Sequence, residues 1–179
     1  MGEGFGVEQS WRKIFVSAIL AVGLCAGRAD SALDSIARSL PTPEQLARFL
    51  NTHLTFREDL PLFGQADYWQ SPEEVLSRGQ GDCEDYASLA ADLLGRLGIR
   101  AFLFSLYGEN GYAHTVCVFV EGGRYSVMNQ DRLLHYRAAS LEELAGKLYR
   151  AGEWGAVAER HGHRGRAVRI IRRSGLSNN

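Results

Sequence analysis

The sequence predicts an α+β fold in which helices come first and an antiparallel sheet follows. Apolar residues recur at helical spacing as far as Leu97, and after Gly98 the period changes from 3.6 to 2. The stretch Glu121-Gly-Gly-Arg124 then separates two strand-like segments, which is typical of a hairpin. Helices followed by a meander of strands characterise α+β domains. The 179 residues leave room for one domain with a sizeable core.

The first 31 residues are typical of a secretory signal or of a membrane or lipid anchor. The basic pair Arg12-Lys13 precedes an apolar run, Ile14–Gly27, that is short for a bilayer span. Small residues in Ala29-Asp-Ser31 have the spacing of a cleavage site. We expect one domain over residues 32–179 and a secreted, periplasmic or cell-envelope location. An internal core helix is the remaining interpretation of the apolar run.

Helices are expected on both sides of an ordered loop. Thr42-Pro-Glu and Ser71-Pro-Glu-Glu are helix starts with proline in the first turn, and the second helix continues to Arg78. Glu58–Gln70 has no periodicity and is interpreted as the loop between them. A central helix begins after two glycines and ends at Gly95–Gly98.

Four strands and one more helix are expected after the central helix. The strands are predicted at Ile99–Leu106, Ala113–Val120, Tyr125–Met128 and Ala167–Ile171, and the helix at Ser140–Arg150.

The start of the central helix carries a cysteine in a setting suited to a nucleophile. Asp82 can cap the helix, and Cys83 lies in its first turn, where the helix dipole favours a thiolate. The carboxylates of Asp82, Glu84 and Asp85 act in the opposite direction and raise the pKa of the thiol. The thiol therefore needs a cationic partner, either a histidinium or a bound metal ion.

A histidine and an asparagine are predicted to meet on two paired strands. By alternation, His114 shares a strand face with Val116, and Cys117 points to the other face. The hairpin brings Asn129 opposite the start of the preceding strand, so its side-chain oxygen can fix the imidazole of His114. Asp131, two residues further on, is the rival for this orienting role.

Three blocks of sequence resemble the transglutaminase-like superfamily, and within it the bacterial transglutaminase-like cysteine proteinases. They are Gly81-Asp-Cys-Glu-Asp-Tyr-Ala, His114-Thr-Val-Cys-Val-Phe-Val and Gly123-Arg-Tyr-Ser-Val-Met-Asn129, and the resemblance covers roughly Tyr68 to Leu133. It implies a papain-like, transglutaminase-like core, a Cys-His-Asp triad and acyl transfer from amides.

Carried over to this chain, the resemblance implies Cys83 as nucleophile and His114 as base. The family's aspartate position matches Asn129, which departs from the usual pattern and leaves a Cys-His-Asn enzyme, a use of Asp131 or a weakened enzyme. The oxyanion hole would use the Cys83 backbone N–H and a side-chain donor upstream, for which Trp69 and Gln80 are candidates.

No cofactor is required by this chemistry, but calcium is a candidate. Some periplasmic members of the resembled family bind calcium through acids that flank the cysteine, and Asp82, Glu84 and Asp85 match these acids by type. Carboxylates in the first turn of a helix are also ordinary caps, so both interpretations stay open.

The expected activity is that of a thiol-dependent amide hydrolase or acyl transferase. Its substrate would be a protein or peptide, attacked through a Cys83 thioester, with water or an amine as the second reactant. The alternative is a catalytically silent domain that serves as a binding or assembly module at the cell envelope. A formal net charge of −1 gives no reason to expect a nucleic-acid partner.

Overall fold

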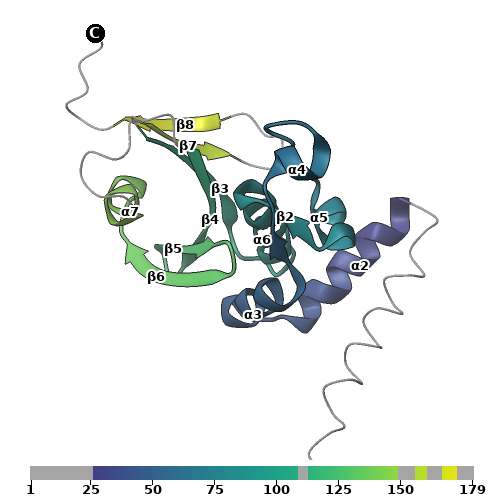
Figure 1. Cartoon of the computed structure of the whole chain (residues 1–179). Coiled ribbons are helices and arrows are strands. Elements are labelled where there is room, and N and C mark those ends of the chain that lie inside the picture. The colour runs from purple at the N-terminus through teal and green to yellow at the C-terminus, as the bar shows by residue number, and fades with distance from the viewer. Residues whose placement is uncertain (1–25, 109–112, 149–155, 161–166, 173–179) are drawn as a thin grey trace, which may run out of the picture.

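A six-stranded antiparallel sheet lies between a group of helices and one further helix (Figure 1). The computed structural model describes residues 26–108, 113–148, 156–160 and 167–172. Its helices are α2 (Ala26–Ser39), α3 (Pro43–His53), α4 (Asp59–Phe63), α5 (Pro72–Arg78), α6 (Cys83–Arg96) and α7 (Leu141–Leu148). Its strands are β1 (Thr55–Phe56), β2 (Gln80–Gly81), β3 (Ala101–Tyr107), β4 (Ala113–Glu121), β5 (Arg124–Asn129), β6 (Arg132–Ala138), β7 (Ala156–Arg160) and β8 (Ala167–Arg172).

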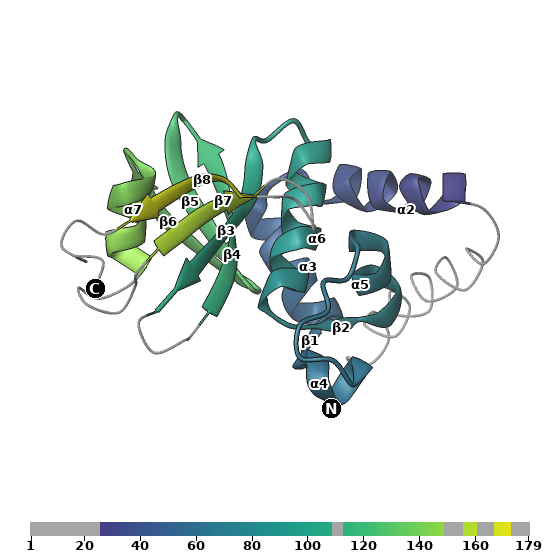
Figure 2. The same ribbon diagram turned by 90° about the horizontal axis from the view of Figure 1, so that it is seen from above.

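The large sheet has the strand order β6-β5-β4-β3-β7-β8. Helix α6 packs on one face, against β3, β4 and β5, and α7 packs on the other face against β5 and β6 (Figure 2). Each face has its own core. Leu103, Cys117 and Phe119 belong to the core beneath α6, whereas Val116 and Val118 belong to the core beneath α7. The predicted α+β class is confirmed, and so is the opposite orientation of Cys117.

The capping signatures predicted in the sequence form as expected. The Thr42 hydroxyl accepts from Gln45 N–H at the start of α3, and the Ser71 hydroxyl accepts from Glu74 N–H at the start of α5. Each such cap contributes about 1 kcal/mol to helix stability. Helix α5 ends at Gly79, whose φ of 67° suits glycine, and the chain then pairs β2 in parallel with β1. This pairing delivers the chain to the start of α6.

Several elements were not predicted, among them the short strands β1 and β2, helix α4 and strands β6 and β7. The segment predicted as a loop, Glu58–Gln70, contains the short helix α4, which Gly64 ends at a φ of 68°. Strand β6 follows β5 through a turn at Gln130, whose φ of 53° is a left-handed conformation that a glutamine does not predict. Strand β7 gains its place by pairing with β3, a long-range contact that local periodicity does not reveal.

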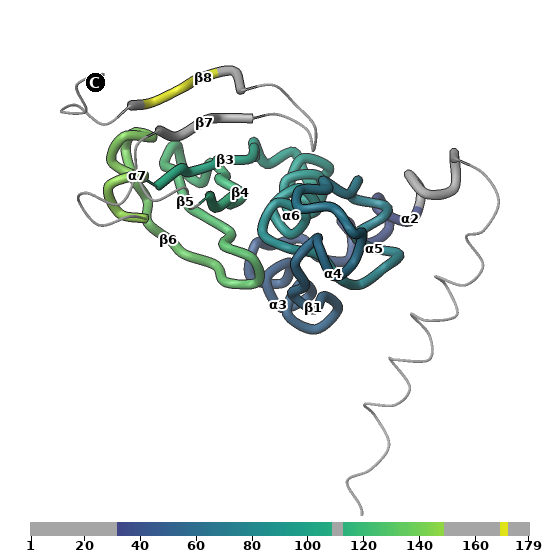
Figure 3. Tube along the Cα trace, turned by 45° about the horizontal axis from the view of Figure 1, so that its top comes forward, coloured from purple at the N-terminus to yellow at the C-terminus, as the bar shows by residue number. Residues whose placement is uncertain are grey.

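The helical layer begins earlier than the predicted domain boundary. Helix α2 starts at Ala26, so it crosses residue 31, and Leu33 and Ala37 are buried beside α6. Figure 3 shows α2 at the outer side of the helical group. The apolar run Ile14–Gly27 lies almost wholly outside the described residues, and removal of a leader stays a prediction. Among the residues that the structure describes, no helix is long and apolar enough to cross a membrane.

Candidate active site

The start of α6 is held in place by a buried carboxylate. Asp85 is fully buried and accepts hydrogen bonds from Gln70 N (2.9 Å), Gln70 Nε2 (2.5 Å) and Asp82 N (3.3 Å). Gly81 makes this possible, because a Cβ there would lie 2.6 Å from the Cβ of Asp85. Burial raises the pKa of Asp85 to about 6, although the bonds from Gln70 and Asp82 act against this shift. Asp85 is thus a support for the first turn of α6.

The thiol of Cys83 lies at the first residue of α6, close to the start of β4. Its Sγ donates a hydrogen bond to Glu84 Oε2 over 3.0 Å, and the Thr115 backbone N–H of β4 is directed at the sulfur. Burial raises the pKa of the thiol well above its usual range, and the Glu84 carboxylate raises it further, while the Thr115 N–H acts to lower it. In this arrangement the thiol is protonated, in the direction that the flanking charges predict.

His114 and Asn129 meet as the strand register predicts. The β4–β5 ladder pairs Cys117 with Met128. Beyond this pair the contact is diagonal, and His114 Nε2 and Asn129 Oδ1 lie 2.9 Å apart. An amide oxygen only accepts, so Nε2 is the donor and Nδ1 is the basic nitrogen of the imidazole. Asp131, the rival orienter, accepts a hydrogen bond from Asn51 of α3 instead.

Carboxylates gather around the thiol in a cluster that extends beyond α6. One ligand atom from each of Asp82, Cys83 and Glu84 lies within 4.8 Å of the others, and the same holds for the set Asp59, Asp67 and Glu84. A further set joins Asp85 to Asp59 and Asp82. We call these six residues the acidic cluster.

The acidic cluster has the chemistry of a site for a hard divalent cation. Asp59 is only 2% exposed, and its Oδ1 and the Oδ1 of Asp82 are buried without a hydrogen-bond partner in the described part of the chain. Burial and then the neighbouring Glu84 raise the pKa of Asp82 to about 9, and burial also raises the pKa of Asp59. Carboxylate oxygens in this number fit Ca²⁺. The acids predicted by type are therefore joined by two that the sequence analysis missed, because their stretch was interpreted only as a loop.

Each of the two candidates for a side-chain oxyanion donor contacts a neighbouring residue, Trp69 through its side chain and Gln80 through its backbone. Trp69 Nε1 donates to Asp67 Oδ1 over 2.7 Å, which places the indole at the acidic cluster. The backbone oxygen of Gln80 accepts from Gln70 Nε2 over 3.0 Å.

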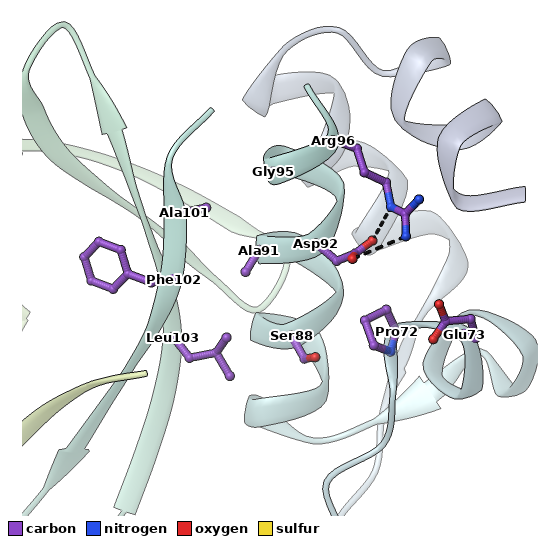
Figure 4. Close-up of a pocket in the computed structure, with 10 residues that line it drawn as sticks. All are labelled: Pro72, Glu73, Ser88, Ala91, Asp92, Gly95, Arg96, Ala101, Phe102 and Leu103. Carbon is purple, nitrogen blue, oxygen red and sulfur yellow. Dashed lines mark hydrogen bonds and ion pairs between the residues drawn. The ribbon is translucent and has the colours of Figure 1, made fainter. Parts of the chain in front are cut away.

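A separate cavity of about 630 Å³ lies along α6, away from the cysteine (Figure 4). It is bounded by α5, α6 and β3, and the side chains of Asp92 and Arg96 form an ion pair at its edge, with Nε and Oδ2 2.6 Å apart. None of the predicted site residues lines it.

These features define a class of protein: a helix that begins at a cysteine packs on an antiparallel sheet whose neighbouring strands carry a hydrogen-bonded His–Asn pair. A family model described as a transglutaminase-like domain matches residues 36–144, which is more than half of the chain. The chain belongs to this transglutaminase-like family. The resemblance stated from three sequence blocks is confirmed.

Known proteins share parts of this chain. LapG of Legionella pneumophila is 21% identical, with a TM-score of 0.50, over 78% of each chain. A calcium-bound structure of LapG is 19% identical, with a TM-score of 0.50, over 81% of this chain and 82% of that one. At these identities the likeness shows the fold alone. The centrosomal protein of 76 kDa from Danio rerio is 38% identical over 69 residues, and the matched part is 10% of that protein's length.

Proposed function

We propose that the chain is a thiol-dependent amide hydrolase or acyl transferase that acts on a protein or peptide. Cys83 is the nucleophile, His114 the general base and Asn129 the residue that orients the imidazole. The observation that carries this proposal is the 2.9 Å contact between His114 Nε2 and Asn129 Oδ1. Thr115, the next residue of β4, has its backbone N–H beside the thiol. Family membership supports the same chemistry.

The reaction would proceed through a thioester. His114 Nδ1 takes the proton of the Cys83 thiol while the sulfur attacks the carbonyl carbon of the substrate amide. The Cys83 backbone N–H, at a helix N-terminus, donates to the resulting oxyanion, and a side chain upstream supplies the second donor. The imidazolium then returns its proton to the leaving amine as the C–N bond breaks. Water or a second amine finally attacks the thioester and regenerates the thiol.

A cation at the acidic cluster would remove the main obstacle to this chemistry. Asp59, Asp67, Asp82 and Glu84 would hold it, and Asp85 would support them through its bonds to the α6 start. Bound calcium would supply positive charge that offsets the carboxylates around the thiol. Glu84, engaged by the metal, would then cease to hold the proton of Cys83, leaving the thiol to His114. LapG, which shares the fold, has been solved with calcium bound.

The first test is the pH dependence of alkylation at Cys83 by iodoacetamide, followed by mass spectrometry on the full chain with calcium or with a chelator. We expect rapid alkylation well below pH 8 in calcium, because a thiolate paired with histidinium reacts where a free thiol does not. Removal of calcium or the substitution His114→Ala should shift the alkylation of Cys83 to higher pH. In the presence of chelator, Glu84→Gln should shift the alkylation of Cys83 to lower pH, because it removes the nearest negative charge.

Cys117 provides an internal control, since it is fully buried and should react only on unfolding. A Cys83 profile that ignores both calcium and His114 would contradict the proposed mechanism.

The alternative function is a catalytically silent module for binding or assembly. The thiol bonded to Glu84 and the asparagine in place of the family's aspartate favour it. The same alkylation profiles distinguish this module from the enzyme, because a silent module has no need of a reactive thiol.

We also propose a cell-envelope setting for either function, on the basis of the N-terminal apolar run. Fractionation of the expressing cell tests it, and recovery of the full-length chain in the cytosol alone would contradict it. No nucleic-acid partner is proposed.

A further inference from the structure

One side chain, Asp67, joins the acidic cluster to a tryptophan. Its Oδ1 accepts the hydrogen bond of Trp69 Nε1 over 2.7 Å. A ligand atom of the same carboxylate group lies within 4.8 Å of those of Asp59 and Glu84. Asp67 is itself exposed, so its carboxylate can move between the two partners at little cost.

The cluster that Asp67 joins contains a buried carboxylate oxygen that has no hydrogen-bond partner among the described residues. The oxygen belongs to Asp59, which is only 2% exposed to solvent. A buried carboxylate oxygen without a donor is costly unless a proton or a metal ion satisfies it. The oxygen lies among the other carboxylates of the set, where a divalent cation would complete it.

The segment between α4 and α5 depends on the same acids. Asp59 Oδ2 accepts from the backbone N–H of Tyr68, Asp67 accepts from the indole of Trp69, and Asp85 accepts from Gln70. Three successive residues of this segment are therefore tied to three acids of the cluster or its support. Trp69 also packs at the edge of the core beneath α6. A change in these acids is transmitted directly to the position of the indole.

We propose that Asp67 couples a cation site to Trp69: a divalent cation bound by Asp59, Asp67 and Glu84 draws the Asp67 carboxylate from the indole N–H and repositions the Trp69 side chain. The inference rests on the cation site of the proposed function but not on its thiol chemistry. A bound cation withdraws electron density from the Asp67 carboxylate and attracts it toward the cluster, so the indole hydrogen bond weakens as the metal bond forms.

Tryptophan fluorescence of the full chain tests this coupling. The substitutions Trp11→Phe and Trp154→Phe leave Trp69 as the single tryptophan of three. We expect its emission to change saturably as calcium chloride is added to chelator-treated protein, with the midpoint at the dissociation constant given by calorimetry. Asp67→Asn should weaken calcium binding about tenfold and reduce the emission change accordingly. Asp67→Glu keeps the carboxylate and should restore most of both.

Glu142→Gln is the matched control, because Glu142 is an exposed acid of α7 that pairs with Arg169 on the opposite face of the sheet. It should leave the titration unchanged. Calcium binding by calorimetry with no change in Trp69 emission would overturn the coupling, as would an Asp67→Asn variant that keeps both signal and affinity. Absence of calcium binding would overturn the cation site and the coupling together. It would leave the dependence of Cys83 alkylation on His114 as the separate measure of the proposed enzyme.

Discussion

At the scale of single residues, the proposed mechanism requires two side chains to compete for the proton of Cys83. Glu84 accepts the thiol hydrogen bond, and His114, which contacts Asn129, is the proposed base. The carboxylate stabilises the neutral thiol, and the imidazole would stabilise the thiolate. The balance between them decides whether the site is reactive, so substitutions that alter only one side are informative.

Replacing Asn129 tests its role as the orienting residue. Asn129→Ala removes the acceptor for His114 Nε2, so we expect the rate of Cys83 alkylation at pH 7 in calcium to fall roughly tenfold or more. Asn129→Asp should preserve or raise the rate, because a carboxylate stabilises the imidazolium. Alkylation quenched at successive times and followed by mass spectrometry measures the rates of both variants.

Asp131→Ala is the control for the Asn129 variants, since Asp131 contacts Asn51 and stands as the rival orienter. A rate that falls for Asp131→Ala and not for Asn129→Ala would reverse the assignment.

The element that positions the nucleophile is the junction of β2 with α6. Gly81 ends β2, and the Asp85 carboxylate occupies the space in which any larger residue at 81 would place its Cβ. The parallel pairing of Phe56 with Gly81 holds the junction from the other side. A rigid junction is what fixes the Cys83 backbone N–H and thiol relative to β4.

Gly81→Ala should therefore destabilise the protein by about 1–3 kcal/mol, because either the junction or Asp85 must move. Gly95→Ala is the matched change within α6, where a Cβ meets nothing within 4 Å. It should stabilise by about 0.5–1 kcal/mol through helix propensity. Urea unfolding of both variants gives the comparison, and equal stabilities would refute the steric argument.

At the scale of the whole molecule, acids buried at one end of α6 make stability depend on pH. Burial raises the pKa of Asp82 to about 9 and that of Asp85 to about 6, from the ordinary value of 3.8. Between the ordinary pKa of 3.8 and these raised values, each carboxyl keeps its proton in the folded chain but has lost it in the unfolded chain. Stability from these groups is therefore fully present below about pH 4 and declines as pH rises toward 9.

We expect the melting temperature in chelator to fall from pH 5 to pH 8.5. Asp82→Asn should flatten this slope, because the amide has no proton to lose, and calcium should flatten it by satisfying the charged form. Exposed glutamates with lowered pKa values, such as Glu44 and Glu142, act below pH 5 and outside this window. Differential scanning calorimetry across the range measures the slope, and a melting temperature that rises with pH would contradict the expectation.

The sequence by itself predicted that helices precede an antiparallel sheet, and it predicted the contact between His114 and Asn129. Periodicity, capping signatures and the hairpin turn are local properties, so they predicted the α+β class and the approach of His114 to Asn129. Burial, which the tertiary structure decides, is the largest cause of the raised pKa of Cys83, and the charge of Glu84 comes second. The sequence predicted only this second contribution, because Glu84 is the next residue in the chain.

Only the tertiary structure decided which acids surround the thiol, and that Asn129 contacts the imidazole while Asp131 contacts Asn51. Asp59, at the start of α4, and Asp67, after it, have carboxylates close to that of Glu84 in α6. Asp131 is bonded to Asn51, which lies 80 residues away in sequence. Strand β7 likewise exists through its pairing with β3. Contacts between distant segments are set by packing and topology, which leave no period or spacing in the local sequence to predict them.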